Sequence, residues 1–377
     1  MPKAGLKKIK TKSSASCRKV AVVLGTRPEL VKMLPVMDAL DKANIETILI
    51  HSGQHYDDLM SEVFFRDMGI RKPDFSLGVG SGSGAWQVAE CMSRLEKILE
   101  KSKPDTVLVQ GDTNTVLAGA ITGARMGLKV GHVEAGLRSY DWRMPEEHNR
   151  KVADHISNLL FAPTKESERI LKSEHVWGEI FVTGNTVLDS CEKFAPIALR
   201  KRRILKKLEH DDFILATTHR AENVDNPAVL KGLVKILENA PLPVVFPIHP
   251  RTVNRLRECK LYGRLAGSGN VQLLDPVGYL DFLSLMMKSR FIFTDSGGIQ
   301  EEATSPSVRK RVLVFRDSTE RPEAVKAGYA HVVGTDPAKV LAAMKQEAAR
   351  KRAVRAGSPY GDGKAGEKIV RILQDTF

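Results

Sequence analysis

The chain has 377 residues, of which 42% are hydrophobic and 27% charged, and its formal net charge is +13. This length predicts two domains, and the composition excludes a disordered chain, a coiled coil, a collagen and a disulfide-stapled mini-protein. No stretch approaches the ~18 consecutive apolar residues of a transmembrane helix. The basic start also lacks the apolar core of a secretory signal, so we expect neither membrane insertion nor export.

The positive charge is concentrated in a few basic runs. Residues 1–19 contain seven Lys or Arg and no acid, and further runs lie at 200–203, 309–311 and 350–352. A nucleic-acid partner is the alternative that these runs raise. Because no aromatic residues interleave them, as a single-strand binder requires, we expect no nucleic-acid partner and a surface suited to small anions.

The sequence offers no pattern for a metal or a dinucleotide cofactor. Four cysteines (Cys17, Cys91, Cys191 and Cys259) lie far apart, which argues against a zinc site or a disulfide framework and fits a reducing, cytoplasmic location. No His, Cys or Asp triplet has metal-ligand spacing, and neither a Walker loop nor a GxGxxG motif after the first strand is present. We therefore expect no cofactor and no metal.

Short apolar runs alternate with longer helical patterns along the chain. The runs that predict strands are 20–24, 47–50, 106–109, 129–133, 159–162 and 180–182 in the first half, and 213–217, 244–247, 271–274, 291–294 and 311–315 in the second. Helical patterns such as 29–40, 85–100 and 228–238 lie between them. Many of the runs are continuously apolar, which is typical of parallel strands covered on both faces. The sequence predicts an α/β fold.

A highly charged stretch, 200–212, separates six predicted strands from five. We place a domain junction there, which implies two doubly wound domains facing a cleft. Ligands of open parallel sheets bind beyond the carboxyl ends of the strands. The polar residues of this chain follow predicted strands in both halves, so we expect a single site lined from both sides.

The first half supplies cations and carboxylates at strand ends. Arg27 and Lys32 begin the helix after the first strand, where two cations suit a diphosphate. Asp112, Glu134 and Glu146 follow later strands or begin a helix, and together they suggest proton transfer with at least one raised pKa. The structural alternatives are a surface pair for Lys32, helix capping for Asp112, and a dipole contact with an i,i+4 pair to Arg150 for Glu146.

The second half supplies groups that suit phosphate. Ser296, Gly297 and Gly298 follow a strand and begin a helix, where free N–H groups can hold an anion; a simple Ser cap is the alternative. His219-Arg220 and His249 also follow strands and favour contact with a phosphorylated ligand. Arg321 precedes Pro322 at another helix start, and an exposed capped helix is the alternative there.

Eight motifs in order carry a resemblance to a known family. They are GTRPELVK (25–32), QGDTNTVLAG (110–119), HVEAGLRS (132–139), MPEEHNR (144–150), VTGNTVLD (182–189), THRAEN (218–223), DSGGIQEEA (295–303) and STERPEAV (318–325). The chain resembles the non-hydrolysing UDP-N-acetylglucosamine 2-epimerases, and its archaeal members in particular. The resemblance implies a GT-B fold, homodimers, and interconversion of UDP-GlcNAc and UDP-ManNAc without NAD or metal.

The same resemblance implies domain limits and site roles. The domains expected are an extension at 1–19, Rossmann-like domains at 20–200 and 201–356, and a C-terminal helix at 357–377 that returns to the first domain. The family's catalytic groups match Asp112, Glu134, Glu146 and His219. Its substrate-binding groups match Arg27, Lys32, His249, Phe282, Ser296, Gly297, Gly298, Glu302 and Arg321, and we add Arg220 to the substrate-binding residues from its position beside His219. Gln54 and His55 match part of a second, activating site.

The family chemistry requires these residues. Its members eliminate UDP across C1–C2 to give 2-acetamidoglucal, and UDP then adds back with the proton on the opposite face. One departure is TSPSVRKRVLV (304–314), which is two residues longer than the usual family loop, so we expect an altered loop there. The alternatives are a UDP-2,3-diacetamido-glucuronate 2-epimerase, a hydrolysing UDP-GlcNAc 2-epimerase, a GT-B glycosyltransferase, and a protein that only binds nucleotide sugars or nucleic acid.

Overall fold

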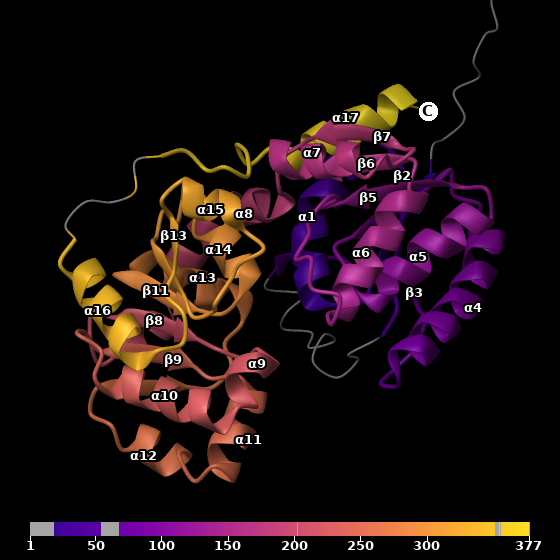
Figure 1. Ribbon diagram of the computed structural model, residues 1–377. Coiled ribbons are helices and arrows are strands. Elements are labelled where there is room, and N and C mark those ends of the chain that lie inside the picture. Colours follow the sequence, from indigo (N-terminus) through magenta and orange to yellow (C-terminus); the bar gives the residue numbers. More distant parts are fainter. Residues whose placement is uncertain (1–18, 54–67, 202, 351–353, 355, 377) are drawn as a thin grey trace, which may run out of the picture.

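The computed structural model describes residues 19–53, 68–201, 203–350, 354 and 356–376 (Figure 1). Two parallel sheets, of seven and six strands, form two lobes. The predicted α/β fold with two doubly wound parallel sheets is confirmed. Gln54, His55 and the basic segment 1–18 lie outside the described residues.

The first lobe is built on the seven-stranded sheet, whose strand order is β3-β2-β1-β4-β5-β6-β7 with every pair parallel. Its strands are β1 (Lys19–Leu24), β2 (Glu46–His51), β3 (Phe75–Ser76), β4 (Thr106–Gln110), β5 (Lys129–Val133), β6 (Leu159–Ala162) and β7 (Glu179–Val182). Its helices are α1 (Arg27–Lys42), α4 (Gly84–Ser102), α5 (Asn114–Arg125), α6 (Pro145–Ile156), α7 (Lys165–Ser173) and α8 (Thr186–Lys201).

The central strand β1 shows why its sequence is continuously apolar. Val20, Val22 and Leu24 belong to the core that includes α1 and α8, whereas Ala21 and Val23 belong to the core that includes α4 and α5. Helices therefore cover both faces of the sheet, and neither face of the strand tolerates a polar residue. The carboxyl ends of these strands form the edge that carries the site described below.

The second lobe is built on the six-stranded sheet, with the order β10-β9-β8-β11-β12-β13 and parallel pairs throughout. Its strands are β8 (Ile214–Thr217), β9 (Val244–Pro247), β10 (Val271–Leu274), β11 (Phe291–Thr294), β12 (Val312–Val314) and β13 (Ala330–Val332). Its helices are the 3₁₀ turn η1 (Ile204–Lys207), α9 (Ala221–Val224), α10 (Pro227–Glu238), α11 (Pro250–Glu258), α12 (Tyr262–Ala266), α13 (Tyr279–Lys288), α14 (Gly297–Glu302), α15 (Pro322–Lys326) and α16 (Pro337–Ala348). None of the helices described here is long and apolar enough to cross a membrane.

Every strand predicted from the sequence coincides with an observed one. Two strands were missed, β3 and β13, which have two and three residues and lie at sheet edges. Such short, partly exposed segments lack the buried apolar run by which the other strands are recognised. The longer loop predicted near 304–311 consists of turns, in which Ser305 and Ser307 both donate hydrogen bonds to Glu192 of α8 at 2.6 and 2.8 Å.

Helix α8 contacts both lobes, and the C-terminal helix completes the first one. α8 packs against α1 on one side and against α13 and α14 on the other. After the second lobe the chain returns to the first. On the way, the carbonyl of Tyr360 accepts the N–H of Asn185, just before α8, at 2.8 Å. The described chain then ends in α17 (Ala365–Thr376). α17 packs against α1 and α8, so the last helix of the chain is part of the first lobe's core (Figure 1).

Gly366 sets how closely α17 approaches α1. A Cβ at this position would lie 2.7 Å from the carbonyl oxygen of Pro35, which is backbone and cannot yield. We expect Gly366→Ala to lower the free energy of unfolding by about 1–3 kcal/mol, because overpacking outweighs the gain of about 1 kcal/mol in helix propensity. Urea unfolding measures this. The control is Gly269→Ala, where a Cβ meets nothing within 4 Å; equal stability of the two variants would contradict the packing described.

Candidate active site

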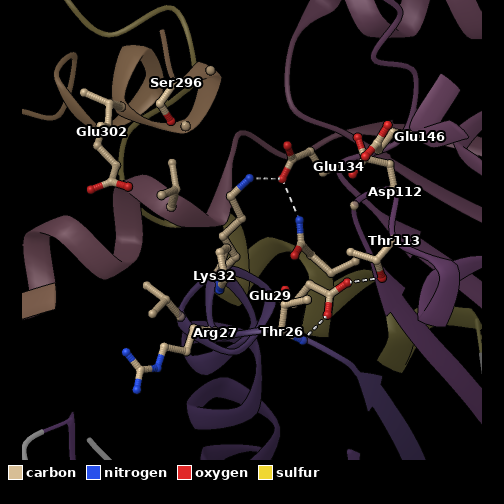
Figure 2. A pocket seen from close by; sticks show the side chains of 18 of the residues that line it. Thr26, Arg27, Glu29, Lys32, Asp112, Thr113, Glu134, Glu146, Ser296 and Glu302 are labelled. Carbon is tan, nitrogen blue, oxygen red and sulfur yellow. Dashed lines mark hydrogen bonds and ion pairs between the residues drawn. The ribbon is translucent and has the colours of Figure 1, made fainter. Parts of the chain in front are cut away.

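A cavity of about 790 Å³ lies between the carboxyl edges of the two sheets (Figure 2). Small-molecule pockets usually measure about 300–1,000 Å³, so this one can hold a nucleotide sugar. The sequence-predicted residues that line it are Arg27, Lys32, Asp112, Glu134, Glu146, His219, Arg220, Phe282, Ser296, Gly297, Gly298, Glu302 and Arg321. Residues more than 290 positions apart in the chain thus meet in one place.

His249 is exposed at the start of α11, beside His219. Its ring centroid lies 5.6 Å from that of His219, and its Nδ1 accepts the N–H of Arg251 at 3.1 Å as the cap of α11. It is not among the described residues that line the cavity. A direct contact between His249 and a ligand therefore stays a prediction.

Glu29 links the turn after β1, which leads into the helix that carries Lys32, to the turn after β4, which carries Asp112. Its carboxylate accepts the N–H groups of Gly25 at 2.6 Å and Thr26 at 2.7 Å, and the hydroxyl of Thr113 at 2.5 Å (Figure 2). Burial raises the pKa of Glu29 to about 7, although these hydrogen bonds oppose the rise. The turn after β1 and the turn after β4 are thereby held side by side.

Glu134 occupies the end of β5 in a strained backbone conformation. Its φ is +71°, which a residue other than glycine adopts only when its surroundings enforce it. The carboxylate is buried and contacts Lys32 Nζ at 2.5 Å (Figure 2). It also contacts Gln110 Nε2 at 2.6 Å and Arg321 Nη2 at 3.5 Å. Every one of these contacts stabilises the ionised form.

The pKa of Glu134 is lowered rather than raised. Burial alone would raise the pKa, but the positive charges of Lys32 and Arg321 outweigh it. The sequence predicts a raised pKa for at least one of the three acids without saying which, and Glu134 is not that acid. The sequence identified the three acids, but it could not show that Lys32 and Arg321 lie beside the carboxylate of Glu134.

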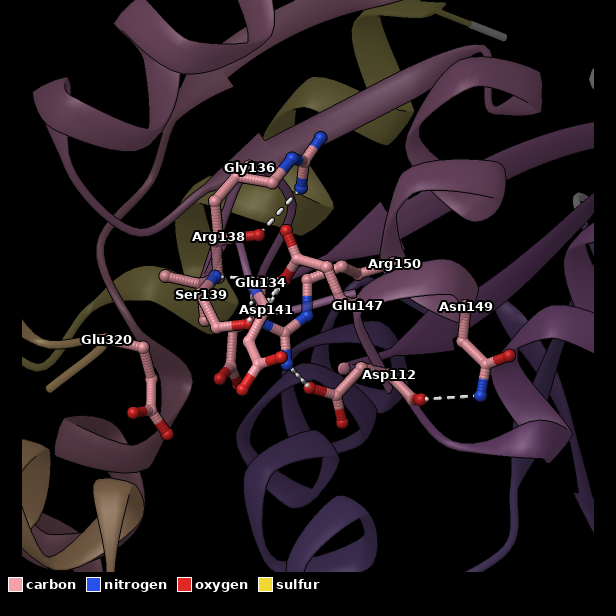
Figure 3. Close-up of polar contacts among 12 residues, drawn as sticks. Asp112, Glu134, Gly136, Arg138, Ser139, Asp141, Glu147, Asn149, Arg150 and Glu320 are labelled. Carbon is pink, nitrogen blue, oxygen red and sulfur yellow. Dashed lines mark hydrogen bonds and ion pairs between the residues drawn. The ribbon is translucent and has the colours of Figure 1, made fainter. Parts of the chain in front are cut away.

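Asp112 faces an arginine and does not cap a helix. Its Oδ2 contacts Arg150 Nη2 at 2.5 Å, and its carbonyl accepts from Asn149 Nδ2 at 3.0 Å (Figure 3). The cap of α5 is Thr113, whose side chain accepts the N–H of Val116. The capping alternative for Asp112 is thus excluded, and its carboxylate is left on the cavity wall.

Arg150 pairs with Glu147 as well as with Asp112, rather than with Glu146. Its Nη1 lies 3.0 Å from Glu147 Oε2, and Glu147 also accepts from the N–H and hydroxyl of Ser139. The i,i+4 alternative for Glu146 is therefore not realised. Glu146 stands exposed at the start of α6, on the same cavity wall as Asp112 (Figure 2).

A buried histidine lies beneath the Asp112 turn. His132 Nδ1 is 2.7 Å from Asp154 Oδ1, and its Nε2 is 2.8 Å from the carbonyl of Gly111. Burial lowers the pKa of His132, but Asp154 outweighs burial and leaves the pKa raised. An imidazolium can donate to both partners, so it fixes the carbonyl that directly precedes Asp112.

On the opposite wall, Asp295 orients the His219-Arg220 pair. This buried carboxylate accepts the backbone N–H of His219 at 3.1 Å and of Arg220 at 3.0 Å, and the amide of Asn223 at 3.0 Å. Its other oxygen lies 3.6 Å from His219 Nδ1. Asp295 therefore sets both the backbone and the ring of His219.

Glu320 forms ion pairs with two arginines beside the start of α14. It contacts Arg220 at 2.7 Å and Arg316 at 2.5 Å, and a Cβ on Gly297 would lie only 3.1 Å from it. Burial raises the pKa of Glu320, but Arg321, Arg220 and Arg316 outweigh burial and lower it to about 2. The Arg220 guanidinium is thereby held at the cavity edge.

The far end of the cavity combines apolar walls with one acid. Val187, Val277, Tyr279 and Phe282 line it together with Glu302. Burial raises the pKa of Glu302 to about 7, although Lys32 opposes the rise. Ser296 holds the N-cap position of α14 without a side-chain cap bond, so its hydroxyl does not act as the simple cap of the alternative reading.

Sequence reasoning missed several residues that organise the site: Glu29, Gln110, His132, Arg150 (considered only as a helix pair), Asp295, Glu301 and Glu320. All seven belong to the quoted motifs, close to residues that were singled out. Their position within these motifs was the only signal that could have identified them. A sequence does not show which of two neighbouring acids points toward the site and which points away from it.

The comparisons with known proteins agree with this geometry. A family model described as UDP-N-acetylglucosamine 2-epimerase matches residues 38–374. A Methanocaldococcus jannaschii protein named UDP-N-acetylglucosamine 2-epimerase is 43% identical over 94% of this chain and 98% of its own length. A Bacillus subtilis protein of the same name is 38% identical over 94% of both chains.

Solved structures extend the agreement to three dimensions. The M. jannaschii enzyme in complex with UDP-GlcNAc and UDP matches with a TM-score of 0.87 at 42% identity, over 95% of this chain and 99% of the other. The Neisseria meningitidis enzyme bound to UDP-GlcNAc matches with a TM-score of 0.85 at 35% identity, over 95% and 100%. With the fold, the cavity and its residues in place, these matches show that the chain belongs to the UDP-N-acetylglucosamine 2-epimerase family.

Proposed function

We propose that the chain interconverts UDP-GlcNAc and UDP-ManNAc by eliminating UDP and adding it back. The observation that carries this proposal is the pair of opposed walls of the cavity. One wall presents the carboxylates of Asp112, Glu134 and Glu146, and the other presents His219 and the Arg220 and Arg321 guanidiniums. Acids near a sugar and cations near a diphosphate are what the elimination needs.

The reaction has to remove a proton from a carbon that no carbonyl activates. A base takes the C2 proton while the C1–O bond to UDP breaks, and the electron pair of the C2–H bond forms the C1=C2 double bond of 2-acetamidoglucal. UDP leaves as an anion, and nearby positive charge stabilises it. Readdition of UDP to C1 and delivery of a proton to the opposite face of C2 give the epimer.

The side chains present suit these steps. Glu134 is held ionised by Lys32 and Arg321, as a base must be, and Asp112 lies on the same wall against Arg150. We assign acid–base roles to Asp112, Glu134, Glu146 and His219. We assign UDP binding to Arg27, Arg220, Arg321 and the start of α14, with Glu302 at the ribose hydroxyls.

The activity is tested by incubating the purified chain with UDP-GlcNAc and following the products by proton NMR. UDP-ManNAc as the sole product supports the proposal. Release of UDP and free ManNAc would instead show a hydrolysing enzyme. Turnover only of UDP-2,3-diacetamido-glucuronate would move the chain toward the Pseudomonas aeruginosa relative of that name, which is 36% identical.

Binding of UDP-GlcNAc should depend on pH through Glu302. Its pKa of about 7 means that the group is largely protonated at pH 6 and ionised at pH 8. An ionised carboxylate accepts both ribose hydroxyls in stronger, charge-assisted bonds, so affinity should rise by about fivefold across this range. Calorimetry measures the dissociation constant and the proton released. Glu302→Gln should bind more weakly and lose this part of the pH dependence; an unchanged slope in the variant would contradict the assignment.

We infer a homodimer that uses the helices of the first lobe. α4 packs on α5, and α5 packs on α6, so these helices form a layer. Trp86 of α4 and Val152 of α6 are 44% and 40% exposed, and they supply apolar side chains on this layer that a partner can cover. Light scattering coupled to gel filtration measures the mass directly, and a mass near 42 kDa would contradict the dimer.

We also place the chain in a reducing compartment, the cytoplasm. Cys91 and Cys191 are buried free thiols. Burial raises the pKa of Cys91 to about 12, so its reactive thiolate is scarce at neutral pH.

A further inference from the structure

Four charged side chains form a ring at the floor of the cavity, and the ring crosses the boundary between the lobes. Lys32 and Glu134 come from the first lobe, Arg321 and Glu301 from the second. Within each lobe the pairs are tight: Lys32 Nζ lies 2.5 Å from Glu134 Oε2, and Arg321 Nε contacts Glu301 Oε1. Between the lobes the contacts are longer, with Lys32 to Glu301 and Arg321 to Glu134 both at 3.5 Å.

Glu301 is the least accessible member of this ring. Its side chain is fully buried, and its Oε2 has Lys32 as a charge partner at 3.5 Å but no hydrogen bond among the described residues. Removing an ion from water costs several kcal/mol, and an apolar residue of similar size often stabilises a fold better. Stability alone therefore does not account for a carboxylate at this position.

Geometry suggests what Glu301 does. Each of its two oxygens faces a different cation, and the same two cations face the two oxygens of Glu134. The two acids and two cations thus alternate around the ring. Without Glu301, Lys32 and Arg321 would share Glu134 as the one remaining anion of the ring, and the charge of both cations would act on Glu134 without a second anion beside them.

We propose that Glu301 is a positioning residue for the epimerisation: it holds Lys32 and Arg321 across the lobe boundary as their second anionic partner, so that neither cation pairs with Glu134 alone. This inference rests on the proposed function, because it concerns the base of that reaction. Glu301 itself does not line the cavity among the described residues and acts through its neighbours. The adjacent Glu302, by contrast, lines the cavity directly.

The charges around the two acids fix the direction of the effect. Glu134 is faced by Lys32 of α1, Arg321, Arg150 of α6 and, as a like charge, Glu301 of α14. Glu301 is faced by Arg321, Lys32, Glu134, Glu302 and the Tyr360 hydroxyl. Burial raises the pKa of Glu301, and Glu134 adds to that rise, whereas Lys32 and Arg321 turn the pKa of Glu134 downward.

Neutralising Glu301 should therefore make Glu134 a weaker base. The variant Glu301→Gln keeps the shape of the side chain but leaves two cations around Glu134 without their second anion. The pKa of Glu134 then falls further, because a like charge has been removed from its surroundings. A weaker base abstracts a proton more slowly, and the acid limb of the pH–rate profile moves to lower pH.

The test compares kcat and KM for UDP-GlcNAc across the pH range in wild type, Glu301→Gln and Glu301→Asp. For Glu301→Gln we expect kcat to fall ~10-fold at neutral pH, and the acid limb to move down by about one pH unit, with KM within about twofold of wild type. Glu301→Asp keeps the charge, so its acid limb should stay near that of wild type even if its kcat is reduced.

Glu192→Gln is the matched control. Glu192 also joins the lobes, through the hydroxyls of Ser305 and Ser307, but it is not part of the ring. Its loss should leave the acid limb in place. This control separates the charge of the ring from a general loosening of the contact between lobes.

Each outcome bears on a different statement. A raised KM with unchanged kcat and pH profile in Glu301→Gln would mean that Glu301 only holds Arg321 for ligand binding, and would overturn the proposal. A shift of the acid limb in Glu301→Asp or Glu192→Gln as large as that expected for Glu301→Gln would overturn the proposal as well. If Glu301→Gln does not fold, the pH profile of Glu301→Asp still tests the proposal, because any shift of its acid limb would contradict it. Absence of epimerisation by the wild-type chain would overturn the proposed function, and this inference with it.

Discussion

The variant Asp112→Asn should turn over UDP-GlcNAc about 10²- to 10⁴-fold more slowly than wild type, which is the usual range for losing a general acid or base. Asn keeps the shape of the side chain and can stay beside Arg150, whose Nη2 now lies 2.5 Å from Asp112 Oδ2. It can neither accept nor deliver a proton at C2. Because we assign Asp112 to the acid–base step at the sugar and not to UDP binding, the dissociation constant for UDP should change little.

Initial rates and calorimetry with UDP separate these two effects. Asp141→Asn is the matched control, because Asp141 pairs with the exposed Arg143 and is not among the described residues that line the cavity. It should retain activity. Full turnover by Asp112→Asn would remove Asp112 from the chemistry, and would argue against both the UDP-GlcNAc and the diacetamido-glucuronate epimerase readings.

Lys32→Met should abolish activity and also destabilise the fold. The change leaves Glu134 and Glu301 facing each other with Arg321 as the shared cation in a buried ring. Breaking a buried ion pair by removing one partner typically costs about 3–5 kcal/mol, since the remaining charge is uncompensated. The pKa of Lys32 is raised, because Glu134 and Glu301 outweigh burial, so the lost group is a permanent cation at neutral pH.

A double variant tells the two effects of Lys32 apart. In Lys32→Met/Glu134→Gln both partners of the tight pair are neutral, so much of the lost stability should return. Activity should not return, because the base is also gone. Chemical unfolding and initial rates of the two single variants and the double variant complete the cycle. Additive losses of stability would contradict a direct Lys32–Glu134 pair.

The sequence was a good guide to the fold because the signals are local. Each long buried strand is a continuous apolar run bounded by polar residues, as in β1 and β4. The rule that ligands bind at the carboxyl ends of parallel strands then predicts that residues such as Arg27, Asp112 and Ser296 gather in one cleft. β3 and β13 were not predicted because they are too short to contain a continuous apolar run.

The electrostatics of the site could not be predicted in the same way. Glu134 is set by Lys32 and Arg321, which lie 102 and 187 positions away in the chain, and neither partner can be inferred from periodicity. The sequence therefore provided no basis for predicting the direction of the Glu134 pKa shift. Likewise, only the packed structure shows that Arg150 turns to Asp112 rather than to Glu146.

Solvent deuterium provides the most direct test of the central claim, that the chain epimerises C2 through removal and return of its proton. The purified chain is incubated with UDP-GlcNAc in D₂O, without added metal or nucleotide cofactor, and followed by proton NMR. The account predicts that UDP-ManNAc appears with deuterium at C2, and that deuterium also enters C2 of the recovered UDP-GlcNAc as the reaction reverses. UDP-ManNAc that retains its C2 proton, or an unchanged substrate, would contradict it.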